Sequence, residues 1–211
     1  MIKKIIGIVI VVVAILASAC IEYKPNINET MTPTIMPTAT TPQPTQIRAP
    51  TVLDLRDLIP QNNLPNDFEL VTVYNDTTSG INSTEQILKY ITGNLSIGSI
   101  SSARGIYRFG GVGNYDVRVT VIKCTSSDNA KNVIENYKKS KPEFKHDVSS
   151  TVARFAKVRF NGHDALEIRE AAADQKNVKY SYIWQNENYV FLVDGNHDRD
   201  ASMELARLTG Y

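Results

Sequence analysis

Cysteine and histidine are scarce in this sequence, which has two Cys and three His among 211 residues. If Cys20 is modified, as argued below, Cys124 has no partner for an internal disulfide, so the fold must depend on its hydrophobic core. No His or basic cluster lies near Cys124 in sequence, and we interpret this residue as a small buried hydrophobe. The histidines at 146, 163 and 197 are too scattered for a zinc motif, and no HExxH or CxxC occurs.

An excess of positive charge is also lacking. The formal charge is +1, and removal of Lys3 and Lys4 with a signal segment leaves 21 basic against 22 acidic residues. Nucleic-acid binding needs clustered basic residues that neutralise phosphates, so this balance argues against a nucleic-acid partner. No GxSxG motif is present, and the glycines of GGVGN join two expected strands rather than a strand and a helix. The sequence therefore contains no recognisable catalytic or phosphate-loop motif.

A long apolar run opens the chain, from Ile5 to Cys20 (IIGIVIVVVAILASAC). It follows the basic pair Lys3 and Lys4 and ends in the small residues Ala, Ser and Ala directly before Cys20. This is the layout of an export signal. We therefore predict a signal peptide over residues 1–19 and an exported remainder.

The LASAC sequence resembles a lipobox, in which the Cys thiol is alkylated with lipid before cleavage. This family usually has Leu three residues before the Cys, whereas here Ala17 holds that place and Leu16 lies one residue earlier. We predict lipid attachment at Cys20, which would hold the protein on the outer face of the cell membrane. An uncleaved signal anchor over Ile5–Ile21 and a secreted product are the alternatives.

Threonine and proline dominate the stretch that follows, and it has no apolar period. We predict a lipid-anchored, extended linker over residues 20–50 and one globular domain over 51–211. Four N-glycosylation acceptor patterns, at Asn28, Asn75, Asn82 and Asn94, suggest a glycoprotein in this exported context.

Alternating and helical apolar patterns define the expected elements of the domain. Strands are expected over Phe68–Tyr74, Ala103–Phe109, Tyr115–Cys124, Thr151–Phe160, His163–Glu170, Lys179–Gln185 and Tyr189–Val193, and helices over Thr84–Thr92, Asp128–Lys139 and Asp198–Thr209. Short turns make neighbouring strands antiparallel. We predict an α+β fold with a mostly antiparallel sheet and helices packed on one face. The strand order loosely resembles the Mog1/PsbP-like fold, and a cystatin-like curved sheet is the rival.

The motif DGNHDRD places Asp194, Asn196, Asp198 and Asp200 at every second position, as in the first half of an EF-hand loop. Arg199 stands where such a loop needs Gly, and Leu205 where it needs the bidentate Glu. We keep this as a weak candidate for Ca²⁺ and otherwise predict no cofactor. The alternative is a turn followed by an acidic helix start, with Asp198 as the cap.

Aromatic side chains alternate on two neighbouring strands. Tyr180, Tyr182 and Trp184 share one face of a strand, and Tyr189 follows on the next strand. These residues are either core packed beneath helices or a platform for a sugar or apolar ligand.

Several segments of the chain have a recognisable texture and order: Cys20 with its Thr/Pro stretch, GIYRFGG, YDVRVTVIKCTSSDNAKNVIENYK, FNGHDALEIRE and YIWQNENYVFLVDGN. Together they resemble the uncharacterised secreted lipoproteins of methanogenic archaea. The resemblance implies an envelope location and brings no catalytic residues with it.

Together these observations predict an envelope lipoprotein that binds an unknown envelope protein or small ligand without catalysis. The alternative is an extracytoplasmic hydrolase whose site is assembled from distant strands.

Overall fold

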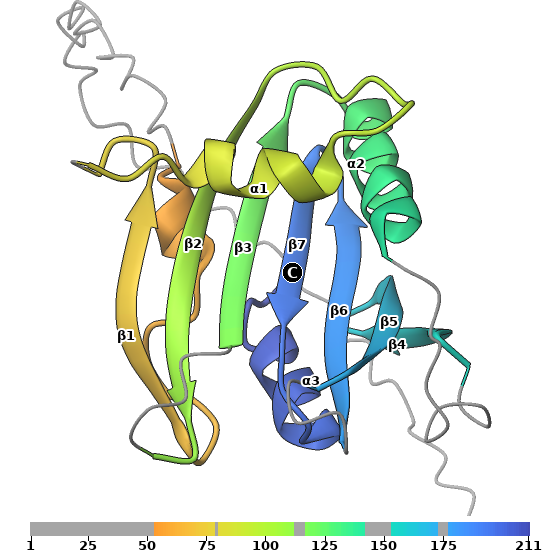
Figure 1. Cartoon of the computed structure of the whole chain (residues 1–211). Coiled ribbons are helices and arrows are strands. Elements are labelled where there is room, and N and C mark those ends of the chain that lie inside the picture. The colour runs from red at the N-terminus through yellow and green to blue at the C-terminus, as the bar shows by residue number, and fades with distance from the viewer. Residues whose placement is uncertain (1–52, 79, 112–116, 142–152, 173–176) are drawn as a thin grey trace, which may run out of the picture. The chain divides into compact units, whose positions relative to one another are not determined.

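The computed structural model describes residues 53–78, 80–111, 117–141, 153–172 and 177–211. They form a seven-stranded sheet, three α-helices and a short 3₁₀ helix (Figure 1). In chain order the elements are η1 Leu55–Leu58, β1 Phe68–Asn75, α1 Ser83–Ile91, β2 Ile100–Phe109, β3 Val117–Cys124, α2 Ser127–Ser140, β4 Phe155–Phe160, β5 His163–Ala171, β6 Val178–Asn186, β7 Tyr189–Asp194 and α3 Arg199–Arg207. The signal segment, Cys20 and the linker lie outside the described residues, as do the expected strand starts at Tyr115 and Thr151.

Every strand pair in the sheet is antiparallel, and the order is β1-β2-β3-β7-β6-β5-β4. The predicted α+β class with a mostly antiparallel sheet is therefore confirmed. The pairing of β3 with β7 joins two groups of sequential strands, and it sets Arg118 opposite Asp194 and Thr120 opposite Leu192 (Figure 1). Residues far apart in sequence thus become neighbours in the middle of the sheet.

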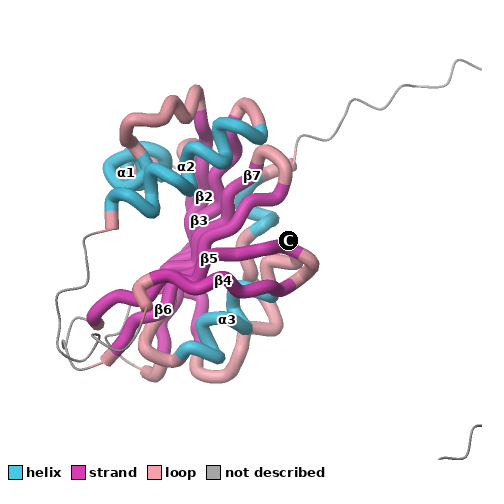
Figure 2. Tube along the Cα trace, turned by 90° about the vertical axis from the view of Figure 1, so that its right-hand side faces the viewer, coloured by secondary structure: helices cyan, strands magenta, loops and turns pink. Residues whose placement is uncertain are grey.

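The sheet is apolar on both faces in its centre. On β7, Phe191 and Val193 belong to one buried cluster, whereas Val190 and Leu192 belong to another, as the alternation of a strand requires. Helices α1 and α2 pack on the second cluster, and η1 and α3 pack on the first (Figure 2). Two hydrophobic layers, rather than one, therefore stabilise the domain.

The distribution of the helices differs from the expectation that they pack on one face. The expectation followed from the alternation in β3, where Val117, Val119 and Val121 alternate with the polar Arg118 and Thr120. Thr120 is nonetheless buried: it accepts a hydrogen bond from Arg104 on β2, α1 packs over β2 and α2 contacts β3. The opposite, apolar face needs its own cover, which η1 and α3 supply.

The turn between β4 and β5 has the geometry that its sequence predicts. Asn161 and Gly162 have φ values of 51° and 81°, as a type I′ turn requires. The register is the strict one, with Lys157 opposite Leu166 and no shift along the pair. The pair contains no bulge. β4 lies at the edge of the sheet, and Lys157 is exposed there although its partner Leu166 is apolar.

Each α-helix begins with a side-chain cap. Asn82 caps α1 by accepting from the N–H of Glu85. Asp198 caps α3 as expected. Leu205 is fully buried at the α3 interface, whereas Leu208 is 37% exposed because the helix ends at Arg207.

Candidate functional site

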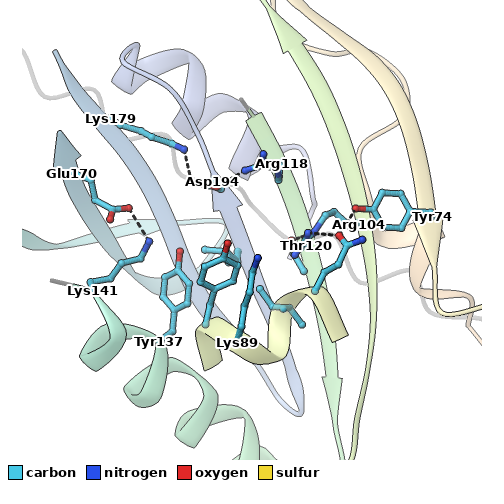
Figure 3. A pocket seen from close by; sticks show the side chains of 14 residues that line it. Tyr74, Lys89, Arg104, Arg118, Thr120, Tyr137, Lys141, Glu170, Lys179 and Asp194 are labelled. Atoms are coloured by element: carbon cyan, nitrogen blue, oxygen red, sulfur yellow. Dashed lines mark hydrogen bonds and ion pairs between the residues drawn. The ribbon is translucent and has the colours of Figure 1, made fainter. Parts of the chain in front are cut away.

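A cavity of about 430 Å³ lies between helices α1 and α2 and the sheet (Figure 3). Its volume falls within the range of small-molecule pockets. Strands β1, β2, β3, β5, β6 and β7 all contribute to it. The lining residues are Tyr74, Gln86, Ile87, Lys89, Tyr90, Arg104, Arg118, Thr120, Tyr137, Lys141, Glu170, Lys179, Leu192 and Asp194. Five of them are basic and two are acidic, so positive charge predominates.

Arg104 on β2 stands out in this lining because it is a charged residue that is only 8% exposed. Its Nε donates to Thr120 Oγ1 over 3.2 Å, and its Nη1 donates to Gln86 Oε1 over 2.9 Å. Both acceptors are neutral, and no ion pair joins Arg104 to any carboxylate of the described residues. A buried cation without a counter-charge is costly, which makes this arginine a candidate for binding an anion.

Lys89 on α1 is a second basic residue without a carboxylate partner within the described ranges. Its Nζ lies 4.8 Å from the centre of the Tyr90 ring, a cation–π contact. Figure 3 shows the Lys89 side chain extending from α1 into the cavity, between Tyr137 and Arg104. Arg104 thus contributes a buried positive charge and Lys89 a solvent-exposed one to the same space, and neither is paired with a carboxylate of the described residues.

The two acidic residues are both held by cations. Asp194 receives Lys179 Nζ at 2.8 Å and Arg118 Nη1 at 3.2 Å, and Glu170 receives Lys141 Nζ at 2.8 Å. Burial acts to raise the pKa of Asp194, but the charge and hydrogen bond of Lys179, with the charges of Lys141 and Arg118, hold that pKa below its ordinary value. The Asp194 carboxylate therefore stays ionised and paired with Lys179 and Arg118. It does not neutralise the charge of Arg104.

Three tyrosines complete the cavity. The Tyr74 hydroxyl donates to Gln86 Oε1 over 3.0 Å, whereas the hydroxyls of Tyr90 and Tyr137 have no hydrogen bond within the part of the chain that is described. Tyr137 is nearly buried, and burial, together with the charges of Asp194 and Glu170, holds its pKa well above the ordinary value. Tyr137 therefore remains a neutral hydroxyl, able to donate a hydrogen bond into the cavity.

The residues of the predicted aromatic platform lie on the opposite face of the sheet. Tyr182 and Trp184 are fully buried in the cluster covered by α3, and Tyr180 and Tyr189 pack against it. Trp184 stacks on Phe191 with ring centres 5.3 Å apart. This arrangement corresponds to the core interpretation of these aromatics.

The oxygen-bearing side chains of the DGNHDRD motif lie in different surroundings and do not converge on one point. Asp194 lies in the cavity described above, whereas Asn196 Oδ1 accepts from the N–H of Asp198 over 2.7 Å and from Ser202 Oγ over 3.2 Å. Asp198 caps α3, and Asp200 is exposed beside it. The described ranges contain no group of three or more His, Cys, Asp or Glu side chains that could hold a metal ion.

The sequence interpretation did not identify this cavity. One signal was present in α2, where Tyr137 continues the buried stripe of Ala130 and Val133 at helical spacing and Lys141 follows directly as the C-cap. A Tyr and a Lys at such positions point toward the sheet beneath the helix. Their partners on β2, β3 and β7 become neighbours only through the strand order, which periodicity alone does not give.

Comparisons of the chain with protein-family models, with curated proteins and with solved structures gave no match. The resemblance to archaeal secreted lipoproteins and the loose Mog1/PsbP-like likeness therefore stay predictions. None of the helices in the described residues has the length and apolar character needed to cross a membrane.

Proposed function

We propose that this protein is an exported, membrane-anchored binding module whose domain takes up a small anionic ligand in the cavity between α1, α2 and the sheet. The export signal and Cys20 support the anchored location, and the linker supports display of the domain away from the membrane surface. This gives the expected envelope lipoprotein a ligand of defined charge. It needs no catalytic step.

The observation that carries the proposal is the buried guanidinium of Arg104, which meets only neutral acceptors. Its Nη2 has no hydrogen bond among the described residues and is not one of the fully enclosed polar atoms, so it is open to the cavity. The buried Tyr137 hydroxyl is a further donor without an acceptor among the described residues, and the exposed Lys89 and Tyr90 also line the cavity. A ligand that supplies acceptors and negative charge satisfies all of these groups.

The carboxylates in the cavity favour a binding role over a hydrolytic one. A general base must be free to accept a proton from a bound reactant or water. Asp194 and Glu170 instead accept hydrogen bonds from Lys179, Arg118 and Lys141. These pairs fix the positions of the surrounding cations, which is the property that an anion-binding cavity needs.

Calorimetric titration of the detergent-purified full chain with inorganic phosphate at low ionic strength tests the binding role. We expect saturable binding, and loss of at least about tenfold in affinity in Arg104→Met, because hydrogen bonds to charged groups contribute about 1.5–3 kcal/mol. Arg159→Met is the matched control, since Arg159 is 73% exposed on β4. Absence of phosphate binding, or equal loss in both variants, would contradict the proposal.

The anchored location has its own test, the intact mass of the protein extracted from native membranes. We expect a chain that begins at Cys20 and carries added lipid. A mass that retains residues 1–19, or an unmodified chain starting at Cys20, would contradict lipid anchoring. Neither result would bear on ligand binding by the domain.

A further inference from the structure

The cavity offers more than a place for a bare oxyanion. Its volume is about 430 Å³, and its two unneutralised cations, Arg104 and Lys89, are both contributed by the half of the cavity formed by α1 and β2. Figure 3 shows the second charged region, Asp194 with Arg118 and Lys179, across the cavity from Lys89. An acidic group bound by Arg104 and Lys89 therefore leaves room for a larger body attached to it.

The groups that would surround this body are hydroxyls and aromatic rings. Tyr90 and Tyr137 present hydroxyls that have no hydrogen bond within the described ranges, and each can donate as well as accept. Among the described residues of the lining, Ile87 and Leu192 are the aliphatic ones. Tyr90 is 43% exposed, so water can reach it, but Tyr137 is buried. A fatty acid or another long apolar acid would leave the Tyr137 hydroxyl without a partner.

The second charged region also limits the ligand. Asp194 accepts from Lys179, Arg118 and the hydroxyl of Ser181, the last over 3.2 Å. A ligand ammonium group would have to displace these cations, so amino acids and polyamines fit poorly. A neutral hydroxyl, by contrast, can add to the hydrogen bonds of this region without displacing a charge.

Resting on the proposed function, we infer that the ligand is a small hydroxylated acid of the sugar phosphate or uronic acid class. Its acidic group binds Arg104 Nη2 and Lys89 Nζ. Its hydroxyls pair with Tyr90 and Tyr137, and its ring C–H groups contact the tyrosine rings. The positively charged end selects the acid, and the tyrosine end selects the sugar.

Titration of the full chain with glucose-6-phosphate, glucuronate, inorganic phosphate and glucose tests this inference. We expect glucose-6-phosphate or glucuronate to bind at least about tenfold more tightly than inorganic phosphate. Glucose should bind far more weakly than either of the two sugar acids. Tyr137→Phe keeps the ring but removes the hydroxyl. It should lower the affinity for the better sugar acid several-fold and leave phosphate affinity unchanged.

The other outcomes show whether the sugar inference fails alone or together with the proposed function. If sugar acids bind no more tightly than phosphate, and Arg104→Met abolishes both, the sugar inference is wrong and the anion-binding function stands. If Tyr137→Phe weakens phosphate and sugar acids equally, the tyrosine does not select the sugar and the inference is wrong. If none of the four compounds binds, the proposed function fails together with the inference.

Discussion

Arg104 on β2 and Gln86 on α1 are joined by a 2.9 Å hydrogen bond from the guanidinium Nη1 to the amide Oε1. The same oxygen accepts from the Tyr74 hydroxyl over 3.0 Å, so three elements meet at one side-chain oxygen. With Nε fixed on Thr120, the guanidinium has a defined orientation and its Nη2 remains open to the cavity. The arginine is thus ordered before any ligand arrives, which lowers the entropic cost of binding.

A site built for a ligand is expected to reduce the stability of the free protein. Replacing Arg104 by Met removes a buried charge that has no counter-charge in the described residues, at the expense of its two hydrogen bonds. We expect Arg104→Met to unfold in denaturant with a free energy within about 1 kcal/mol of the wild type, or higher. A loss of about 3 kcal/mol would show that the arginine is a structural residue instead.

Replacing Asp194 should change the stability of the fold and its affinity for phosphate in opposite directions. Asp194→Asn leaves Lys179 and Arg118 without their shared carboxylate, and we expect a loss of about 1–3 kcal/mol because these groups are partly exposed. The same change removes a negative charge from the cavity lining, so phosphate should bind more tightly. Denaturant unfolding and calorimetry measure the two effects, and weaker phosphate binding by a folded variant would contradict the electrostatic account.

The pH dependence of stability follows from the lowered pKa of Asp194, where burial is outweighed by Lys179, Lys141 and Arg118. A carboxyl group whose pKa is lower in the folded state stabilises the fold above its unfolded pKa of about 3.9 and loses this contribution as pH falls through the folded value. We expect stability to decline below about pH 4 in the wild type, and to decline less in Asp194→Asn. Identical acid profiles would contradict this contribution.

Helix α3 covers the face of the sheet opposite the cavity, chiefly through Leu205. We expect Leu205→Ala to cost about 2–5 kcal/mol of unfolding free energy, as for other fully buried leucines. Leu208→Ala is the control on the same segment and should cost well under 1 kcal/mol, since this residue is 37% exposed. Equal losses in thermal or denaturant unfolding would contradict the observed packing of α3.

Cys124 should be inert in the folded protein. It is buried at the end of β3, and burial raises the pKa of its thiol to about 11. In a Cys20→Ser background, we expect iodoacetamide to label Cys124 at pH 8 only under unfolding conditions, because both access and thiolate are lacking in the native state. Rapid labelling of the native chain, read by mass spectrometry, would contradict this placement.

Local sequence signals predicted the three α-helices and the seven strands that the structure describes. Asn161 and Gly162 specified a type I′ turn and with it the register of β4 and β5. The helical stripe of α2 likewise follows from the spacing of Ala130, Val133 and Tyr137. These features depend on residues close in sequence, where turn geometry and periodicity act directly.

The pairing of strands that are distant in sequence could not be predicted from these local signals. The contact of β3 with β7 brings Arg118 to Asp194 across 76 positions of sequence, and nothing in either strand specifies that neighbour. The alternation of β3 predicts one buried face, whereas the polar Arg118 and Thr120 on the other face line the cavity beneath α1. Polar residues on a strand show that a face is not apolar core, but they do not distinguish water from a binding site.

The most direct test of the central claim is a crystal structure of the protein soaked with selenate, with the anion located by the anomalous signal of selenium. The account predicts a selenate within hydrogen-bond distance of Arg104 Nη2 and Lys89 Nζ, in the cavity between α1, α2 and the sheet. Crystals of Arg104→Met should lack that peak. Selenate found only at the outer surface, with the cavity of the wild type empty, would contradict the account.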